Sequence, residues 1–283
     1  MRWHTRRQER LAFALFGLAM AIILAPVAII TGLLLYRGLP TLSWTFLTQP
    51  PGAGMTSGGI FPAIVGTLLL VVGTILLALP VGVAAGVYLT EYARQGWPVR
   101  LIRLAIVNLA GVPSIVFGLF GVVVFVVLLG FGRSLAAGWG TLALLVLPVT
   151  ITATEEALRA VPDDLRQASL ALGATRSQTV WRVVLPGALP GILTGAIIAV
   201  GRAAGETAPI LLTTASFYQA FLPRSVFDQV MALPYHLYTI ATQVPNAPAN
   251  MKWGTALVLL LIVLGMNLGA VLLRARLRGR ARW

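Results

Sequence analysis

The chain has 283 residues, of which 58% are hydrophobic and only 10% are charged, and it contains no cysteine. Its mean hydropathy is +0.89. Because soluble domains carry about 25% charged residues, this composition excludes an ordinary water-soluble protein. The lack of cysteine excludes disulfide scaffolds and thiolate metal sites. The formal charge of +13 comes from basic residues in short stretches between apolar runs, so we expect no nucleic-acid partner.

Apolar runs long enough to cross a bilayer recur along the chain. A transmembrane helix needs about 20 apolar residues, and each crossing should be helical because backbone polar groups must be satisfied within lipid. We therefore predict an all-α integral membrane protein with six transmembrane helices. They cover residues 11–35, 60–90, 104–132, 135–154, 187–216 and 253–273, with kinks or unwound turns at Pro80, Pro113, Pro148 and Pro209.

The distribution of basic residues predicts the orientation. With a cytoplasmic N-terminus, sixteen basic residues lie inside and four lie outside, at Arg37, Arg133, Arg224 and Lys252. Basic residues prefer the cytoplasmic side of membrane proteins, so both termini are expected there. The first apolar run is longer than the apolar core of a signal peptide, which favours an uncleaved helix.

Two outer segments are expected to be peripheral. The glycine-rich residues 52–59 lack a phosphate-binding loop pattern and are interpreted as a flexible turn. Within residues 217–252, the helical spacing of Val226, Val230, Leu233 and Leu237 predicts a short helix on the outer surface. The only histidines, His4 and His236, are expected at the surface, and we predict no metal site.

The cytoplasmic residues 155–186 are expected to form two short helices. Asp163 and Asp164 suit the first turn of a helix, Leu165, Ala168, Ser169 and Leu172 would share one face, and Gly173 suits its end. Thr175 and Gln178 have the spacing of a capping box for the second helix, which should end before Pro186.

This segment also carries a motif. Gln167-Ala168-Ser169 is followed at fixed spacing by Gly173 and by Val183-x-Leu185-Pro186. The spacing resembles the EAA loop of ATP-binding-cassette importer permeases, whose pattern is EAA-x3-G-x9-I-x-LP. The resemblance implies a MetI-like type I importer fold and docking of this loop on a cytoplasmic ATPase. The coupling residues would be Leu165, Gln167, Ala168, Ser169, Gly173, Ala174, Val183, Leu185 and Pro186, with Gln167 replacing the usual glutamate.

A charged pair interrupts the fifth span. An arginine in mid-bilayer is retained only with a partner or a water-filled path, and Glu206 lies four residues beyond Arg202, one helical turn along the same face. The pair either fixes helix register or offers a guanidinium to a crossing oxyanion. We favour the second interpretation. Glycines at four-residue intervals, Gly187, Gly191, Gly195 and then Gly201 and Gly205, indicate a central, closely packed helix.

A second resemblance, carried by three further strings, concerns the substrate. Residues 201–213 read GRAAGETAPILLT, residues 154–162 read TEEALRAVP, and residues 111–121 read GVPSIVFGLFG. These strings resemble the A-type permease family of Pst phosphate importers, PstA. The resemblance implies a substrate pathway at Arg202, Glu206, Thr207 and Ser114. For Ser114, beside Pro113, the alternative is a kink without ligand contact.

The same resemblance implies the surroundings of the chain. Expected partners are the second permease PstC, a dimer of the ATPase PstB and the phosphate-binding protein PstS, in a bacterial inner membrane. The chain itself should be non-catalytic and bind no cofactor, with ATP and Mg²⁺ used by the ATPase. Residues 1–58 would precede the permease domain 59–273, and residues 274–283 would form a basic tail. Alternatives are a permease for sulfate or molybdate, and a channel or membrane enzyme without ATPase coupling.

Overall fold

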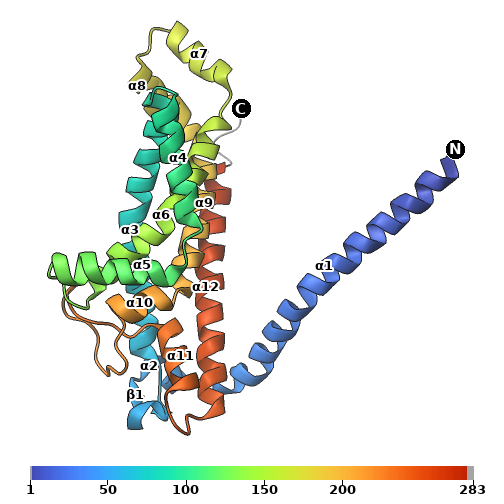
Figure 1. Ribbon diagram of the computed structural model, residues 1–283. Coiled ribbons are helices and arrows are strands. Elements are labelled where there is room, and N and C mark those ends of the chain that lie inside the picture. Colours follow the sequence, from blue (N-terminus) through green and yellow to red (C-terminus); the bar gives the residue numbers. More distant parts are fainter. Residues whose placement is uncertain (1, 279–283) are drawn as a thin grey trace.

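A computed structural model describes residues 2–278 as an almost entirely helical protein (Figure 1). The long helices are α1 (Arg2–Gly38), α3 (Phe61–Val87), α6 (Leu135–Arg159), α9 (Leu185–Gly205) and α12 (Ala249–Arg278). Shorter helices are α2 (Trp44–Thr48), α4 (Trp97–Ala110), α5 (Ser114–Gly121), α7 (Asp163–Ala171), α8 (Arg176–Thr179), α10 (Ala208–Thr213) and α11 (Leu233–Thr242). Wider π-type turns cover η3 (Tyr88–Tyr92), η4 (Val122–Leu128) and η5 (Val180–Val184).

Five helices are long and apolar enough to span a membrane. The predicted third span is not one helix: α4 is followed by α5 and η4 at an angle of 102°, and the six predicted spans are reached if this bent pair counts as one crossing. The bend falls at the sequence Gly111-Val112-Pro113. Pro113 has no N–H to donate and restricts the residue before it, which favours the interruption predicted here. At Pro80 and Pro148, where kinks or unwound turns were also predicted, α3 and α6 continue without an unwound turn.

The fifth span, predicted over 187–216 with a kink or unwound turn at Pro209, is broken next to that proline. Helix α9 ends at Gly205, and Glu206 has an extended backbone with φ −72° and ψ 134°. Helix α10 then begins at Ala208 with Pro209 in its first turn. Pro209 would clash with the carbonyl of Gly205 in a continuous helix and could not bond to it, which explains the break.

The bundle is held together by α3, α6, α9 and α12 (Figure 1), and α9 packs on the other three. Glycines make the closest approaches. A Cβ added to Gly191 would lie 2.5 Å from the Cβ of Ala157, and one added to Gly195 would lie 2.4 Å from the Cβ of Ala153, both on α6. The predicted central, glycine-mediated packing of this helix is confirmed at Gly191 and Gly195 but not at Gly205, where an added Cβ would meet nothing within 4 Å.

We expect Gly195→Ala to destabilise the protein by about 1–3 kcal/mol, because the added methyl group meets a Cβ that cannot move without its backbone. The matched control is Gly269→Ala on α12, where an added Cβ meets nothing within 4 Å. Apparent melting temperatures in detergent measure both variants. Equal melting temperatures for the two would show that the α6–α9 contact is not close-packed.

Helix α1 diverges from the bundle along most of its length (Figure 1). It contacts α12 near its C-terminal end, where the Arg37 guanidinium lies 5.1 Å from the centre of the Trp253 ring. Its apolar side chains, such as Phe13 and Phe16, are 70% and 73% exposed in the isolated chain. A surface of this kind is compatible with lipid.

The predicted flexible turn at residues 52–59 is instead a small packed hairpin. Strands β1 (Pro51–Gly52) and β2 (Ser57–Gly58) pair antiparallel. Between them, Met55 is completely buried in a cluster with Phe46 and Ile60. The glycines of this segment indicated a flexible loop, whereas burial of the apolar Met55 side chain holds the segment against the protein.

The prediction of a surface helix containing Val226 and Val230 is wrong. Val230 forms an isolated bridge with Ala215, and the helix in this region, α11, begins only at Leu233. It is packed into the protein rather than lying on it, since Leu233, Pro234 and Tyr235 are buried.

His236 on α11 is 1% exposed, so its predicted place at the surface is also wrong. Burial disfavours the charged imidazolium and lowers the pKa of His236 to about 4. The histidine is therefore neutral across physiological pH. The same prediction for the His4 side chain falls outside the residues whose side chains the structure describes.

Candidate functional site

The break between α9 and α10 gathers the charges of the fifth span. Arg202 lies in the last turn of α9, and Glu206 is the residue that ends the helix. No other charged residue belongs to α9 or α10. In Figure 1 the break is near the middle of the bundle, level with α5, which lies across the other helices.

The two charges form a loose ion pair. The Nε of Arg202 lies 3.6 Å from the Oε1 of Glu206, which is beyond hydrogen-bond distance. Their side chains are 30% and 16% exposed in the isolated chain. The prediction that they pair is confirmed. The geometry differs from the prediction, because Glu206 has an extended backbone beyond the end of α9 and does not share a helical face with Arg202. Because the pair is loose and partly accessible, the guanidinium retains capacity to donate to a further anion.

The second broken span packs beside this one. Val112 and Phe117, on either side of the α4–α5 bend, share a hydrophobic cluster with Ala203 and Ala204 of α9. Helix α5 also approaches α10, where a Cβ on Gly118 would lie 3.0 Å from the Cα of Pro209. Two interrupted helices thus meet at mid-bundle. Irregular backbone at membrane depth is tolerated only inside protein or beside a water-filled cavity.

The other two predicted pathway residues lie at these interruptions. Thr207 is the non-helical residue between α9 and α10, and Ser114 is the first residue of α5. Both are partly exposed. Within residues 2–278 no hydrogen bond joins either side chain to Arg202 or Glu206. The structure therefore places all four residues at or beside the two breaks, with Arg202 and Glu206 paired and neither hydroxyl bonded to that pair.

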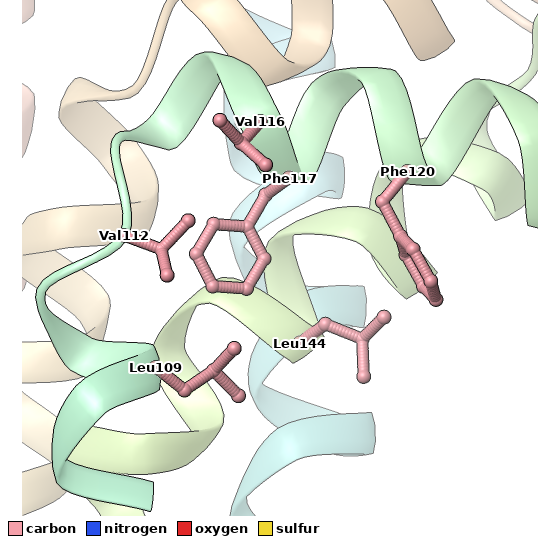
Figure 2. A pocket seen from close by; sticks show the side chains of 6 residues that line it. All are labelled: Leu109, Val112, Val116, Phe117, Phe120 and Leu144. Carbon is pink, nitrogen blue, oxygen red and sulfur yellow. The ribbon is translucent and has the colours of Figure 1, made fainter. Parts of the chain in front are cut away.

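A cavity of about 290 Å³ lies in the elbow between α4 and α5 (Figure 2). Phe117 points into the elbow (Figure 2), and every lining side chain is apolar. An unpaired anion would lose its hydration there without compensation, so this cavity is unsuited to an anion pathway. It is lined by Leu109, Val112, Val116, Phe117, Phe120 and Leu144.

The segment with the EAA-like spacing projects from one end of the bundle as α7 and α8 (Figure 1). The predicted capping box is present: Gln178 N donates to Thr175 Oγ1 at 3.3 Å, and Thr175 N donates to Gln178 Oε1 at 2.8 Å. Gly173 has φ +83°, the left-handed conformation that ends α7 at low cost for glycine. The predicted helix–turn–helix is confirmed.

The expected end of the second helix before Pro186 is wrong. Helix α8 continues through η5 into α9, so residues 176–205 form one 30-residue helical segment. The wider π-type turn over Val180–Val184 precedes Pro186, which occupies the first turn of α9. Pro186 lies inside this continuous segment, and the π-type turn directly before it already departs from regular α-helical hydrogen bonding, which accommodates the missing N–H of the proline.

The EAA-like residues divide between an inner and an outer face. Leu165 packs in a cluster with Val184 and Leu185, and Ser169 Oγ lies 2.9 Å from Thr179 Oγ1. The predicted shared face is therefore only partly right, because Ala168 is exposed and Leu172, beyond the end of α7, is 90% exposed. Exposed residues of the motif are Gln167, Ala168, Gly173 and Pro186, whereas Leu165, Ser169, Ala174, Val183 and Leu185 are partly buried.

A buried ion pair connects this segment to the first core span. Arg166 Nη2 of α7 donates to Glu91 Oε1 of η3 at 2.9 Å, with side chains 18% and 10% exposed. Arg166 also donates to the carbonyls of Leu158 and Val161 at the end of α6, at 2.7 and 2.6 Å. Sequence reasoning missed this pair because its members are 75 positions apart, although Glu91 directly follows a long uncharged run.

A second contact reinforces the connection. Arg176, the first residue of α8, donates to the backbone carbonyl of Glu91 and lies over the ring of Tyr92, 5.6 Å from its centre. Both short helices are thus attached to η3. Movement of α7 and α8 would be passed directly to α3, because η3 is the continuation of that helix.

Comparison with known proteins decides the family. Residues 78–283 match the family described as "Binding-protein-dependent transport system inner membrane component". The chain belongs to this family. It is 37% identical to the probable ABC transporter permease protein YqgI of Bacillus subtilis, over 93% of each chain. It is also 37% identical to the phosphate transport system permease protein PstA of Mycobacterium leprae, over 93% of this chain and 87% of the relative.

A solved transporter structure has the same fold as this chain. The match to an inward-facing MetNI methionine ABC transporter has a TM-score of 0.58 at 21% identity, and covers 77% of this chain and 94% of the other. The predicted MetI-like importer permease fold is confirmed. The permease family and the membrane-spanning helices together make this chain an integral subunit of the inner membrane.

Proposed function

We propose that the protein is the permease subunit of an ATP-driven phosphate importer and forms half of the translocation pathway. The observation that carries the proposal is the partly accessible guanidinium of Arg202, held by Glu206 at 3.6 Å where α9 breaks. A guanidinium can donate two parallel hydrogen bonds to a tetrahedral oxyanion. The 37% identity to a phosphate permease over most of the chain supports phosphate as that anion.

The pair suits transport because Glu206 and an arriving anion would compete for the guanidinium of Arg202. Glu206 offsets the cost of keeping a positive charge within the bundle while no anion is present. An arriving phosphate would accept the guanidinium donors in place of the carboxylate, whose 3.6 Å separation leaves no hydrogen bond to break. Thr207, and Ser114 from the neighbouring break, would add hydroxyl donors along the path.

The energy for transport would come from partner subunits. The exposed residues Gln167, Ala168 and Leu172 would dock on an ATPase of the PstB type. That ATPase would use ATP and Mg²⁺, and this chain would itself bind no cofactor. A PstC-type permease would supply the other half of the pathway, and a PstS-type protein would deliver phosphate. The α7 end, with both termini, would face the cytoplasm, as the arginine distribution predicts.

Uptake of radiolabelled phosphate tests the proposal. Proteoliposomes containing the chain with its second permease and ATPase should accumulate phosphate when ATP and the binding protein are present. A tenfold excess of unlabelled phosphate should suppress the signal, whereas the same excess of sulfate or molybdate should not. Preferential suppression by sulfate or molybdate would identify a different oxyanion permease, and uptake without the ATPase would indicate a channel.

A further inference from the structure

A second cavity, of about 570 Å³, opens at the end of the bundle that carries α7. It lies where α4 begins beside the end of α6, and three arginines line it: Arg100, Arg103 and Arg159. The remaining lining residues are Gln95, Gly96 and Trp97. This cavity is distinct from the α9–α10 break and from the exposed face of α7.

One of the three guanidiniums builds the wall of the cavity. Arg103 Nε donates to Glu155 Oε2 at 2.9 Å, its Nη1 donates to Gln95 Oε1 at 2.8 Å, and its Nη2 donates to the carbonyl of Leu89 at 2.9 Å. Every nitrogen of this guanidinium is therefore engaged by protein. Glu155 is 7% exposed, so the wall is fixed by a largely buried carboxylate.

The other two guanidiniums keep donors for a ligand. Among the described residues 2–278, the Arg159 side chain donates only through Nη2, to Glu155 Oε2 at 2.9 Å, and it is 55% exposed. The Arg100 side chain is exposed and donates no hydrogen bond to any residue within 2–278. Since Glu155 balances one of the three positive charges, the cavity carries a net excess of positive charge suited to an anion.

The start of α4 adds to this preference for an anion. Its N-cap residue Gly96 provides no side-chain cap, and Pro98 follows in the first turn. The N–H groups of Trp97 and Val99 consequently have no intrahelical acceptor and, with the helix dipole, favour negative charge beside them. Gly96 and Trp97, at the start of this helix, line the cavity together with the three arginines, so the helix dipole and the guanidiniums favour an anion in the same place.

The cavity also lies at the level expected of a membrane surface. Trp97, which lines the cavity, is 77% exposed, and Tyr88 and Tyr92 of η3, the element that precedes α4 in the chain, are 59% and 38% exposed; exposed Trp and Tyr are typical of the boundary between lipid and water. Further along α4, Leu101 and Leu104 are 56% and 55% exposed and provide an apolar surface for acyl chains. The arginine-lined cavity therefore suits the anionic head group of a phospholipid, and the apolar face of α4 suits its acyl chains.

We propose that this cavity binds the phosphate group of an anionic phospholipid such as phosphatidylglycerol. Arg100 and Arg159 donate to the phosphate oxygens, and Arg103 with Glu155 holds the wall in place. The lipid would brace the start of α4 against the end of α6, beside the helices that receive the ATPase. The proposal does not depend on which cargo the permease carries.

Native mass spectrometry of the complete transporter tests the lipid site. Phosphatidylglycerol is titrated into the detergent-solubilised complex, with phosphatidylcholine as the zwitterionic control lipid. The double variant Arg100→Gln with Arg159→Gln should weaken the tightest binding by roughly 25-fold, because each basic residue near an anionic membrane contributes a factor of about five. Arg100→Gln alone, which removes no protein contact of that side chain, should weaken it about fivefold.

The matched control is Arg10→Gln with Arg276→Gln, which removes two charges from exposed side chains of α1 and α12. It should leave the tightest binding unchanged. Equal losses in the two double variants, or no loss in either, would overturn the site. Inorganic phosphate is added as a competitor, and displacement of the lipid signal by it would overturn the lipid assignment in favour of a site for free phosphate.

Discussion

Reversing the charge of Arg202 with Arg202→Glu is expected to reduce phosphate uptake by roughly 100-fold or more. A charge-assisted hydrogen bond contributes about 1.5–3 kcal/mol, and the variant replaces the donors with a carboxylate beside Glu206. Uptake into proteoliposomes measures the effect, and co-purification of the ATPase measures assembly, which should persist. The matched control is Arg224→Glu, a reversal at an exposed outer position.

The exchange Arg202→Glu with Glu206→Arg separates the two interpretations of the pair. If the pair only fixes helix register, the exchange restores a salt bridge and should restore uptake. If the guanidinium must stand at position 202 to meet an anion, uptake should stay near the level of the single variant. Normal uptake by the single variant would refute a role for Arg202 in the pathway.

Neutralising Glu91 with Glu91→Gln is expected to lower the phosphate transported per ATP hydrolysed by about tenfold. Single substitutions along a coupling route change coupling by about 0.5–2 kcal/mol. Here the change leaves the largely buried Arg166 without its carboxylate partner and loosens α7 from η3. Parallel measurements of phosphate uptake and ATP hydrolysis by the reconstituted complex give the ratio.

Asp163→Asn provides a closely matched control for Glu91. Asp163 also accepts a hydrogen bond from Arg166, at 3.0 Å, but its side chain is 82% exposed and it belongs to α7 itself. Exposed pairs contribute about 0–1 kcal/mol, and this one crosses no boundary between elements. The ratio should therefore change less than twofold. If both variants shift the ratio equally, or neither does, Glu91 does not transmit movement to α3.

Much of the site was predictable because its signals are local. The capping box of Thr175 and Gln178 and the turn at Gly173 follow from spacings of a few residues, and the structure has both. The pairing of Arg202 with Glu206 follows from a separation of four residues. An interruption of this span was predicted at Pro209, and the structure has it at Glu206 and Thr207, just before that proline. The apolar residues alone would not show it, because an apolar run looks the same whether its helix is continuous or interrupted.

The misplaced surface elements have a similar cause. Val226 and Val230 have helical spacing but lie before α11, and His236 is polar yet 1% exposed. Periodicity and polarity describe a segment alone, whereas burial depends on what packs against it. The buried pair of Glu91 and Arg166 joins positions far apart in the chain, and no spacing rule links them.

The amino-acid sequence alone predicted the apolar membrane spans, the kink at Pro113, the helix–turn–helix at residues 163–179 and the family, because hydrophobic length, proline and short-range hydrogen bonds act over consecutive residues. The tertiary structure decided the 102° angle of that bend, the meeting of the two broken spans and the attachment of α7 to η3. Those features arise where distant segments share space, because only packing determines which polar and charged groups become partners.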